Sequence, residues 1–189
     1  TTADTGNTNK EVTTGTGGSV LLSATIGIGT STNRIDTTTD TLAAQLTGTP
    51  TGDIFIRETD ALAVGSVTPL DNFNSGTAIA GITTANNRSI TLETLAGTLS
   101  VNENVSANGT GNVALKAGGA TSDIAIASGK SVGSTGAGTV QLVAGQSITT
   151  ADTGNTNKEV TTGTGGSVLL SATIGIGTST NRIDTTTDT

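Results

Sequence analysis

The seven residues from 112 to 118 read Asn-Val-Ala-Leu-Lys-Ala-Gly, and this pattern decides the fold. Side chains two residues apart point to the same face of a β-strand, so Val113 and Leu115 share one face. Asn112 and Gly118 flank the run, and both residue types favour tight turns because they tolerate positive φ. The stretch therefore predicts a short strand with one apolar face.

The same alternation recurs along the chain, at residues 19–22, 53–56, 89–92, 139–142 and 167–170. The first apolar residues of the six motifs are Val20, Ile54, Ile90, Val113, Val140 and Val168. Each interval between motifs holds further short apolar segments, bounded by Gly, Asn, Asp or Ser; among them are Leu62–Val64, Ile79–Ile82, Leu99–Val101 and Ile124–Ile126. The pattern predicts about three short strands in each interval.

A long internal repeat organises these motifs. Residues 1–41 and residues 149–189 are identical, which defines a repeat unit of 148 residues. We interpret residues 1–148 as one complete tandem repeat and residues 149–189 as the start of the next. Five of the short motifs fill one repeat, and the sequence is typical of a window cut from a longer array.

These features predict an all-β fold, a parallel β-solenoid with about three short strands per turn and about five turns per repeat. Aliphatic residues would stack in columns, with Val20, Ile54, Ile90, Val113, Val140 and Val168 in one of them. A β-sandwich is the rival all-β fold, but sandwiches keep large aromatic residues in the core, and here only Phe55 and Phe73 are aromatic. Disorder is a further alternative, although 32% hydrophobic content with regular spacing argues against it.

Composition excludes several classes of function. The chain has 189 residues with 8 basic and 15 acidic side chains, and the scattered basic residues and net charge of -7 argue against nucleic-acid binding. Cysteine is absent, so disulfides do not indicate a compartment. The polar start shows no signal segment, and no apolar run reaches transmembrane length, so we expect no membrane insertion of this segment.

Two stretches resemble a known family. Residues 101–118 and residues 138–149 are similar to the repeats of filamentous-haemagglutinin-type adhesins and autotransporter passengers, with the shape Gly-x-Val-x-Leu-x-Ala-Gly followed by x-Ser-Ile-x. The resemblance is clearest over residues 88–150. It implies a right-handed parallel β-helix in a giant bacterial surface protein, secreted and elongated, that serves as a stalk or adhesin. It brings no catalytic residues.

Catalytic candidates are few because the chain contains no histidine, the usual general base. Paired carboxylates cleave glycans in some β-helices, and the candidates for such a pair are Asp53, Glu58 and Asp60. We interpret them instead as solvated charges on a strand and its turn. We therefore expect no catalytic residue and no enzyme.

We expect no cofactor, and calcium is the one metal for which the sequence offers candidate ligands. Asp4, Asn7, Asn9 and Glu11 supply oxygen ligands, which calcium prefers. However, Gly6 is misplaced for an EF-hand, and a corner loop with Asx turns explains the stretch equally well. The same two interpretations apply to residues 36–40. Three Asn-x-Ser/Thr sequons also occur, at Asn87, Asn104 and Asn108.

The expected function is structural: a stiff extracellular fibre or surface stalk that is built from tandem repeats and whose partners are copies of itself. The alternative, from another class, is an adhesin-type binding module that recognises a glycan or a host surface. Exposed aromatic or basic patches would favour the alternative, and the sequence shows neither.

Overall fold

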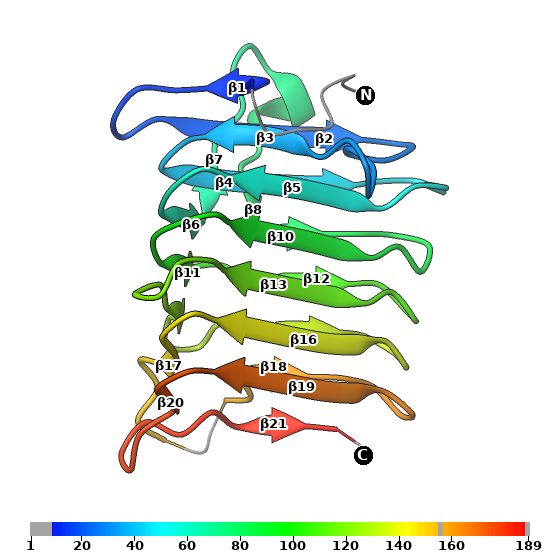
Figure 1. Ribbon diagram of the computed structural model, residues 1–189. Helices are drawn as coiled ribbons and strands as arrows, with labels where there is room; N and C mark the ends of the chain where they lie inside the picture. Colours follow the sequence, from blue (N-terminus) through cyan, green and yellow to red (C-terminus); the bar gives the residue numbers. More distant parts are fainter. Residues whose placement is uncertain (1–8, 155–156, 188–189) are drawn as a thin grey trace.

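The computed structural model describes residues 9–154 and 157–187, and these form a parallel β-solenoid of about seven coils (Figure 1). In Figure 1 the chain crosses the near face from right to left, returns across the far face and descends towards the C-terminus, so the coil is right-handed. The predicted fold class is therefore confirmed. Parallel pairing arises because each coil runs in the same direction as the coil before it.

One face of the coil is a parallel sheet that contains seven strands within the described residues. In spatial order they are β1 (Val12–Thr13), β3 (Ile35–Thr38), β5 (Ile54–Glu58), β10 (Ile90–Thr94), β13 (Val113–Ala117), β16 (Thr139–Ala144) and β19 (Ser167–Ala172). Four of the predicted motifs supply its central strands, and each motif is one coil further along the axis.

The other two faces belong to a sheet that contains twelve strands within the described part of the chain. One column is β20 (Gly175–Ile176), β17 (Ser147–Thr150), β14 (Ile124–Ile126), β11 (Leu99–Val101) and β6 (Leu62–Val64). The other is β9 (Ile82–Thr83), β12 (Val105–Ala107), β15 (Val132–Ser134), β18 (Val160–Thr161) and β21 (Thr185–Thr186). The strand β4 (Thr41–Leu46) joins the columns and also pairs with β2 (Ser19–Ala24).

The core consists of aliphatic columns that run along the axis. Ile54, Ile90, Val113 and Val140 are Cα partners in successive coils, and all four are fully buried. The second and third faces carry the same arrangement; for example, Leu62, Leu99, Ile124 and Ile148 form one such column. Each aliphatic side chain stacks on a similar side chain of the next coil, so valine, isoleucine and leucine fill a narrow core. This explains why these residues recur along the chain.

Polar residues at the corners connect one coil to the next. The residue just before a strand accepts a hydrogen bond from the backbone N–H of the equivalent residue in the following coil. Thus the Ser89 N–H donates to Asp53 Oδ1 at 2.9 Å, and the Thr139 N–H donates to Asn112 Oδ1 at 2.7 Å. The Ser147 N–H donates in the same way to Asp123 Oδ1 at 2.9 Å. These side chains satisfy backbone groups at the corners, where the sheet ladder is interrupted.

Glycine is required just before two strands of the seven-stranded sheet, β13 and β16. A Cβ on Gly138 would lie 2.1 Å from the carbonyl oxygen of Gly111 in the preceding coil, and a Cβ on Gly111 would lie equally close to the carbonyl oxygen of Arg88. The coils therefore approach too closely at this corner for any side chain. This contact explains the Gly that opens the Gly-x-Val-x-Leu motif.

One predicted column position is wrong. Val20 pairs with Leu42 on the twelve-stranded sheet and does not lie above Ile54, and its neighbour Leu22 pairs with Ala44. Residues 35–38 and 41–46 form two strands that the alternating pattern did not reveal, so the interval from Val20 to Ile54 holds more than one coil. The identical segment 167–172 does lie in the seven-stranded sheet, where Val168 pairs with Val140. The same six residues thus occupy different faces in the two copies.

An insertion leaves the coil between β6 and β9. It contains an antiparallel pair, β7 (Ser66–Val67) and β8 (Ile79–Ala80), and a short 3₁₀ segment at Phe73–Gly76. Within this part only Ile79–Ile82 was predicted as a strand; Ile79–Ala80 joins the antiparallel pair, and the chain re-enters the coil at Ile82. The positive φ of Asp71, Asn72 and Asn74 folds the residues between the two strands into a compact tip. Across residues 9–154 and 157–187, no helix has the length and apolar character needed to span a bilayer.

Truncation of a core side chain tests the columns. Ile90→Ala removes a fully buried side chain that is stacked between Ile54 and Val113, and should lower the free energy of unfolding by about 2–5 kcal/mol. The control Thr91→Ala changes the outward-facing neighbour and should cost less than about 1 kcal/mol. Chemical denaturation measures both variants, and equal losses would contradict the inward and outward assignment.

Candidate functional site on the outer face of the seven-stranded sheet

A ladder of alternating charges crosses the outer face of the seven-stranded sheet. Asp36, Arg57, Glu93 and Lys116 are Cα partners on the successive strands β3, β5, β10 and β13. Opposite charges that face each other on neighbouring strands attract, whereas like charges would repel. We call these four residues together with Arg34 the charged ladder.

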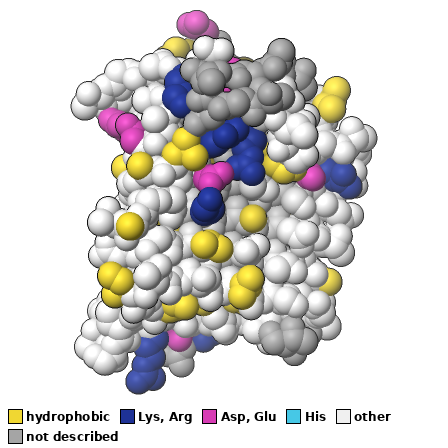
Figure 2. Space-filling view, viewed as in Figure 1, with side chains coloured by type: hydrophobic (Ala, Val, Ile, Leu, Met, Phe, Trp, Pro, Cys, Tyr) yellow, Lys and Arg dark blue, Asp and Glu magenta, His cyan; other side chains and the backbone are white. Residues whose placement is uncertain are grey.

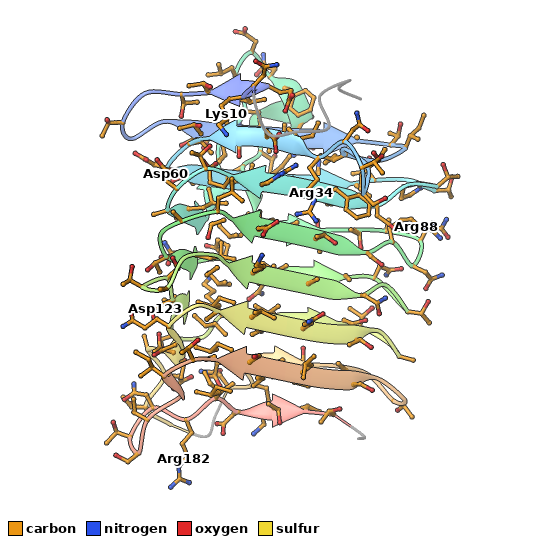
Figure 3. All side chains as sticks on the ribbon, viewed as in Figure 1. Lys10, Arg34, Asp60, Arg88, Asp123 and Arg182 are labelled. Carbon is orange, nitrogen blue, oxygen red and sulfur yellow. The ribbon has the colours of Figure 1, made fainter. Side chains whose placement is uncertain are left out.

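Glu93 is the centre of the charged ladder. Arg34 Nη1 donates to Glu93 Oε2 at 2.6 Å, and Lys116 Nζ donates to Glu93 Oε1 at 2.6 Å. Burial alone would raise the pKa of Glu93, but the hydrogen bond and charge of Lys116, with those of Arg34, hold this pKa below its usual value. Glu93 therefore stays ionised and fixes two cations over the sheet. Figure 3 shows Arg34 over the near face, beside β5 and β10.

The other end of the ladder is buried. Arg57 Nε lies 3.0 Å from Asp36 Oδ1, but the contact lacks hydrogen-bond geometry, and both oxygens of Asp36 are buried without a hydrogen-bond partner. Burial raises the pKa of Asp36, and the charge of Arg57 opposes this shift only in part. A buried pair of this kind is held by the surrounding fold and adds little net stability.

A shallow depression of about 210 Å³ accompanies the charged ladder. Its floor is formed by small or short outward side chains, including Thr91 and Ala114, and its rim by Arg34, Glu93 and Lys116. In Figure 2 the basic and acidic side chains gather in the upper middle of this face, among mostly uncharged neighbours. Typical small-molecule sites are larger and more enclosed, so the depression suits contact with a surface rather than capture of a ligand.

The side chain of Glu58, at the end of β5, points into the core. Glu58 is fully buried, so the interpretation of a solvated charge is wrong at this position. The Thr37 hydroxyl donates to Glu58 Oε2 at 2.5 Å, and the Thr59 N–H donates to Glu58 Oε1 at 2.8 Å. Burial raises the pKa of Glu58 despite these two hydrogen bonds.

The three candidate catalytic carboxylates have different surroundings. Asp53 precedes β5 and accepts the corner hydrogen bond from Ser89, whereas Glu58 is the last residue of the same strand. Asp60 is exposed and lies at the left edge of the molecule in Figure 3, opposite Arg88 at the right edge. Asp53 and Glu58 are therefore separated by the length of a strand, roughly 17 Å at about 3.3 Å per residue, which is too far for a shared catalytic task.

Two of the calcium candidates, Asp4 and Asn7, lie outside the described residues. The other two, Asn9 and Glu11, have different surroundings. Asn9 is exposed, while Glu11 Oε2 accepts the Asp36 N–H at 2.7 Å. Among the residues described by the structure, no group of three or more acidic, His or Cys side chains could hold a metal ion. Within the second candidate stretch, Asp40 accepts the Gly17 N–H and Asp36 contacts Arg57.

In the second copy, the described residues that correspond to this stretch make local hydrogen bonds. Asp152, which corresponds to Asp4, accepts hydrogen bonds from the Gly154 N–H at 3.1 Å and from Asn157 Nδ2 at 2.5 Å. The hydrogen bond from Asn157 is the main cause of a lowered pKa at Asp152. Glu159 Oε2 accepts the Asp184 N–H at 2.7 Å, as Glu11 does in the first copy. The geometry is that of a corner loop with an Asx turn.

The three sequon asparagines are exposed and belong to the corners. Asn87 Oδ1 accepts the Thr110 N–H at 3.0 Å, Asn104 Oδ1 accepts the Ser131 N–H at 2.9 Å, and Asn108 Oδ1 accepts the Asn87 N–H at 3.3 Å. Their side-chain oxygens thus connect coils, which gives these asparagines a structural role whether or not they carry sugar.

Sequence reasoning missed the charged ladder, although a signal was present. Arg57, Glu93 and Lys116 each follow the first apolar residue of a motif by three positions. Aligning the motifs would therefore have placed these residues side by side with alternating sign. The contribution of Arg34 could not have been found in this way, because it lies in a turn outside the motifs.

Comparisons with protein-family models, with curated proteins and with solved structures find no match for this chain.

Removal of the central carboxylate tests the charged ladder. Glu93→Gln should lower the free energy of unfolding by about 1 kcal/mol or less at low ionic strength, because two ion pairs are lost. Added salt should reduce this cost, since the Debye length falls to about 3 Å at 1 M. The control Glu103→Gln breaks a single ion pair, with Lys130, which is more exposed to solvent. It should therefore lower the free energy of unfolding by less. A cost that is independent of salt would contradict the electrostatic role.

The pH dependence of stability tests the buried carboxylic acid. The pKa of Glu58 is raised in the folded state above its usual 4.5, so the folded state binds the proton more tightly than the unfolded state. The stability of the wild type relative to Glu58→Gln should therefore increase as the pH falls from the raised pKa to 4.5. Denaturation at several pH values measures this difference. Glu103→Gln serves as the control, and a relative stability that decreases on acidification would overturn the assignment.

Proposed function

We propose that this chain is a structural module that forms a stiff extracellular fibre or stalk from tandem β-solenoid repeats. One observation carries the proposal. The described part of the second copy stacks on the end of the first through β15–β18, β16–β19 and β17–β20, by the same parallel pairing that operates inside the repeat. The junction between repeats is therefore built like any other pair of coils.

The mechanism is mechanical. Sheet hydrogen bonds run from coil to coil along the axis, and aliphatic columns fill most of the interior. In such a protein the stability is approximately a sum of interfaces between neighbouring units, and the length grows with the number of copies. The partners are then further copies of the repeat, and no membrane insertion or nucleic-acid binding is proposed for a chain with a net charge of -7.

The resemblance to filamentous-haemagglutinin-type adhesins and autotransporter passengers supports the extracellular location and the role as a stalk. The second candidate function is an adhesin-type binding module, and the observation in its favour is the charged ladder with its shallow depression. The ladder is nearly neutralised internally, because Asp36 and Glu93 oppose three cations. We therefore favour the structural role, and we propose no enzymatic activity for a chain that lacks both histidine and cysteine.

The length of arrays with different copy numbers tests the proposal. Between five and six coils per 148 residues, each rising by about 4.8 Å, should lengthen the particle by roughly 26 Å per added repeat at a constant cross-section. Small-angle X-ray scattering of chains with one and three complete repeats measures both quantities. Increments of roughly 40 Å with flexible joints would indicate separate beads, and specific binding to a glycan array would favour the adhesin.

A further inference from the structure

The insertion between β6 and β9 exposes apolar side chains that the fold of one repeat does not cover. Leu70 is 83% exposed and Phe73 is 53% exposed, at the tip formed by the residues with positive φ. A cluster of large exposed apolar residues usually marks a surface that contacts another protein or another part of the same assembly. Phe73 is moreover one of only two aromatic residues in the chain.

The insertion lies beside the outward face of β2. Ser19 and Leu21 of this strand, together with Pro69, Leu70 and Phe73, line an open depression of about 530 Å³. Figure 1 shows that the tip of the insertion rises past β2 at the N-terminal end of the coil. The tip therefore extends into the region beside the coil that would precede β2 in an array.

The second copy identifies that preceding coil. Residues 167–172 are identical to β2, and they pair with β16 so that Leu169 lies opposite Gln141 and Ser167 lies opposite Thr139. Leu169 and Gln141 both point outward from the seven-stranded sheet. In the first copy, Leu21 likewise points outward from β2, where it lies beside the insertion. In an array, Thr139 and Gln141 of one repeat would thus lie directly above Ser19 and Leu21 of the next.

The outward face of β16 is open to contact by a neighbouring element. Thr139, Gln141 and the adjacent Ala114 line a shallow depression of about 370 Å³, and both Thr139 and Gln141 are exposed. Leu169 is 52% exposed, whereas the equivalent Leu21 is half-buried beside the insertion. The outward leucine of this segment is thus better covered where an insertion lies next to it.

We propose that the insertion is a clasp between repeats, in which Leu70 and Phe73 pack on Thr139 and Gln141 of the preceding copy. The occupant of this surface is a second copy of the same repeat, in continuation of the β16–β19 interface, and the inference rests on the proposed tandem array. The clasp adds a side-chain contact outside the coil to the main-chain pairing at each junction.

Directed disulfide formation tests the clasp, because the chain has no cysteine of its own. The test uses a chain extended by one copy of residues 1–148, with Gln141→Cys in the first repeat and Phe73→Cys in the second. Mild oxidation should give an intrachain disulfide. The matched control carries both substitutions in the same repeat, where several coils separate them, and should give none. A disulfide between chains would instead assign the tip to a neighbouring fibre and would overturn the proposal.

A second measurement separates the clasp from the array. Leu70→Ser with Phe73→Ser should lower the melting temperature when placed in the second repeat, and should have no such effect in the first repeat, which has no copy before it. Amide hydrogen exchange at Val20 and Leu22 of the second repeat reports whether the coils stack. Protection without a disulfide and without the melting difference would refute the clasp alone, whereas rapid exchange would refute the continuous array as well.

Discussion

Parallel pairing between successive coils is the interaction on which the whole structure depends. A single coil leaves its strand N–H and C=O groups unpaired, and only the coils above and below can satisfy them. This pairing brings equivalent residues of successive coils together. The residue at each position must therefore pack against the residue at the same position of the next coil. Isoleucine stacks on isoleucine or valine at Ile54, Ile90 and Val113, and Gly111 is followed by Gly138 where the backbones come too close for a side chain.

The same constraint governs the polar residues. Corner residues such as Asp53, Asn112 and Asp123 recur because each can accept the backbone N–H of the following coil. Charged residues cannot stack on their own kind, and the charged ladder avoids this by alternating sign from Asp36 to Lys116. The ladder and the corners are thus two solutions to one problem, namely how to stack polar groups in register.

The sequence predicts the central coils well and the first coils poorly. Four alternating motifs, from Ile54 to Val140, occupy the predicted column because each has one apolar face and one coil separates it from the next. The strand Ile35–Thr38 is mostly polar and carries no such alternation, so Val20 was assigned to the wrong face. Alternation shows that a strand has an inner side, but it does not show which face of the coil the strand joins. The burial of Glu58 was missed for a related reason, since its partner Thr37 lies on that unrecognised strand.

The two placements of one segment have a consequence for the shape of a long array. Residues 19–24 lie on the twelve-stranded sheet, and the identical residues 167–172 lie on the seven-stranded sheet. Each repeat in the proposed fibre is therefore rotated about the axis relative to its predecessor. A given segment of the repeat thus lies on a different face of the coil in successive repeats. A flat ribbon bends easily in one direction, but a beam whose flat sides turn from unit to unit resists bending nearly equally in all directions.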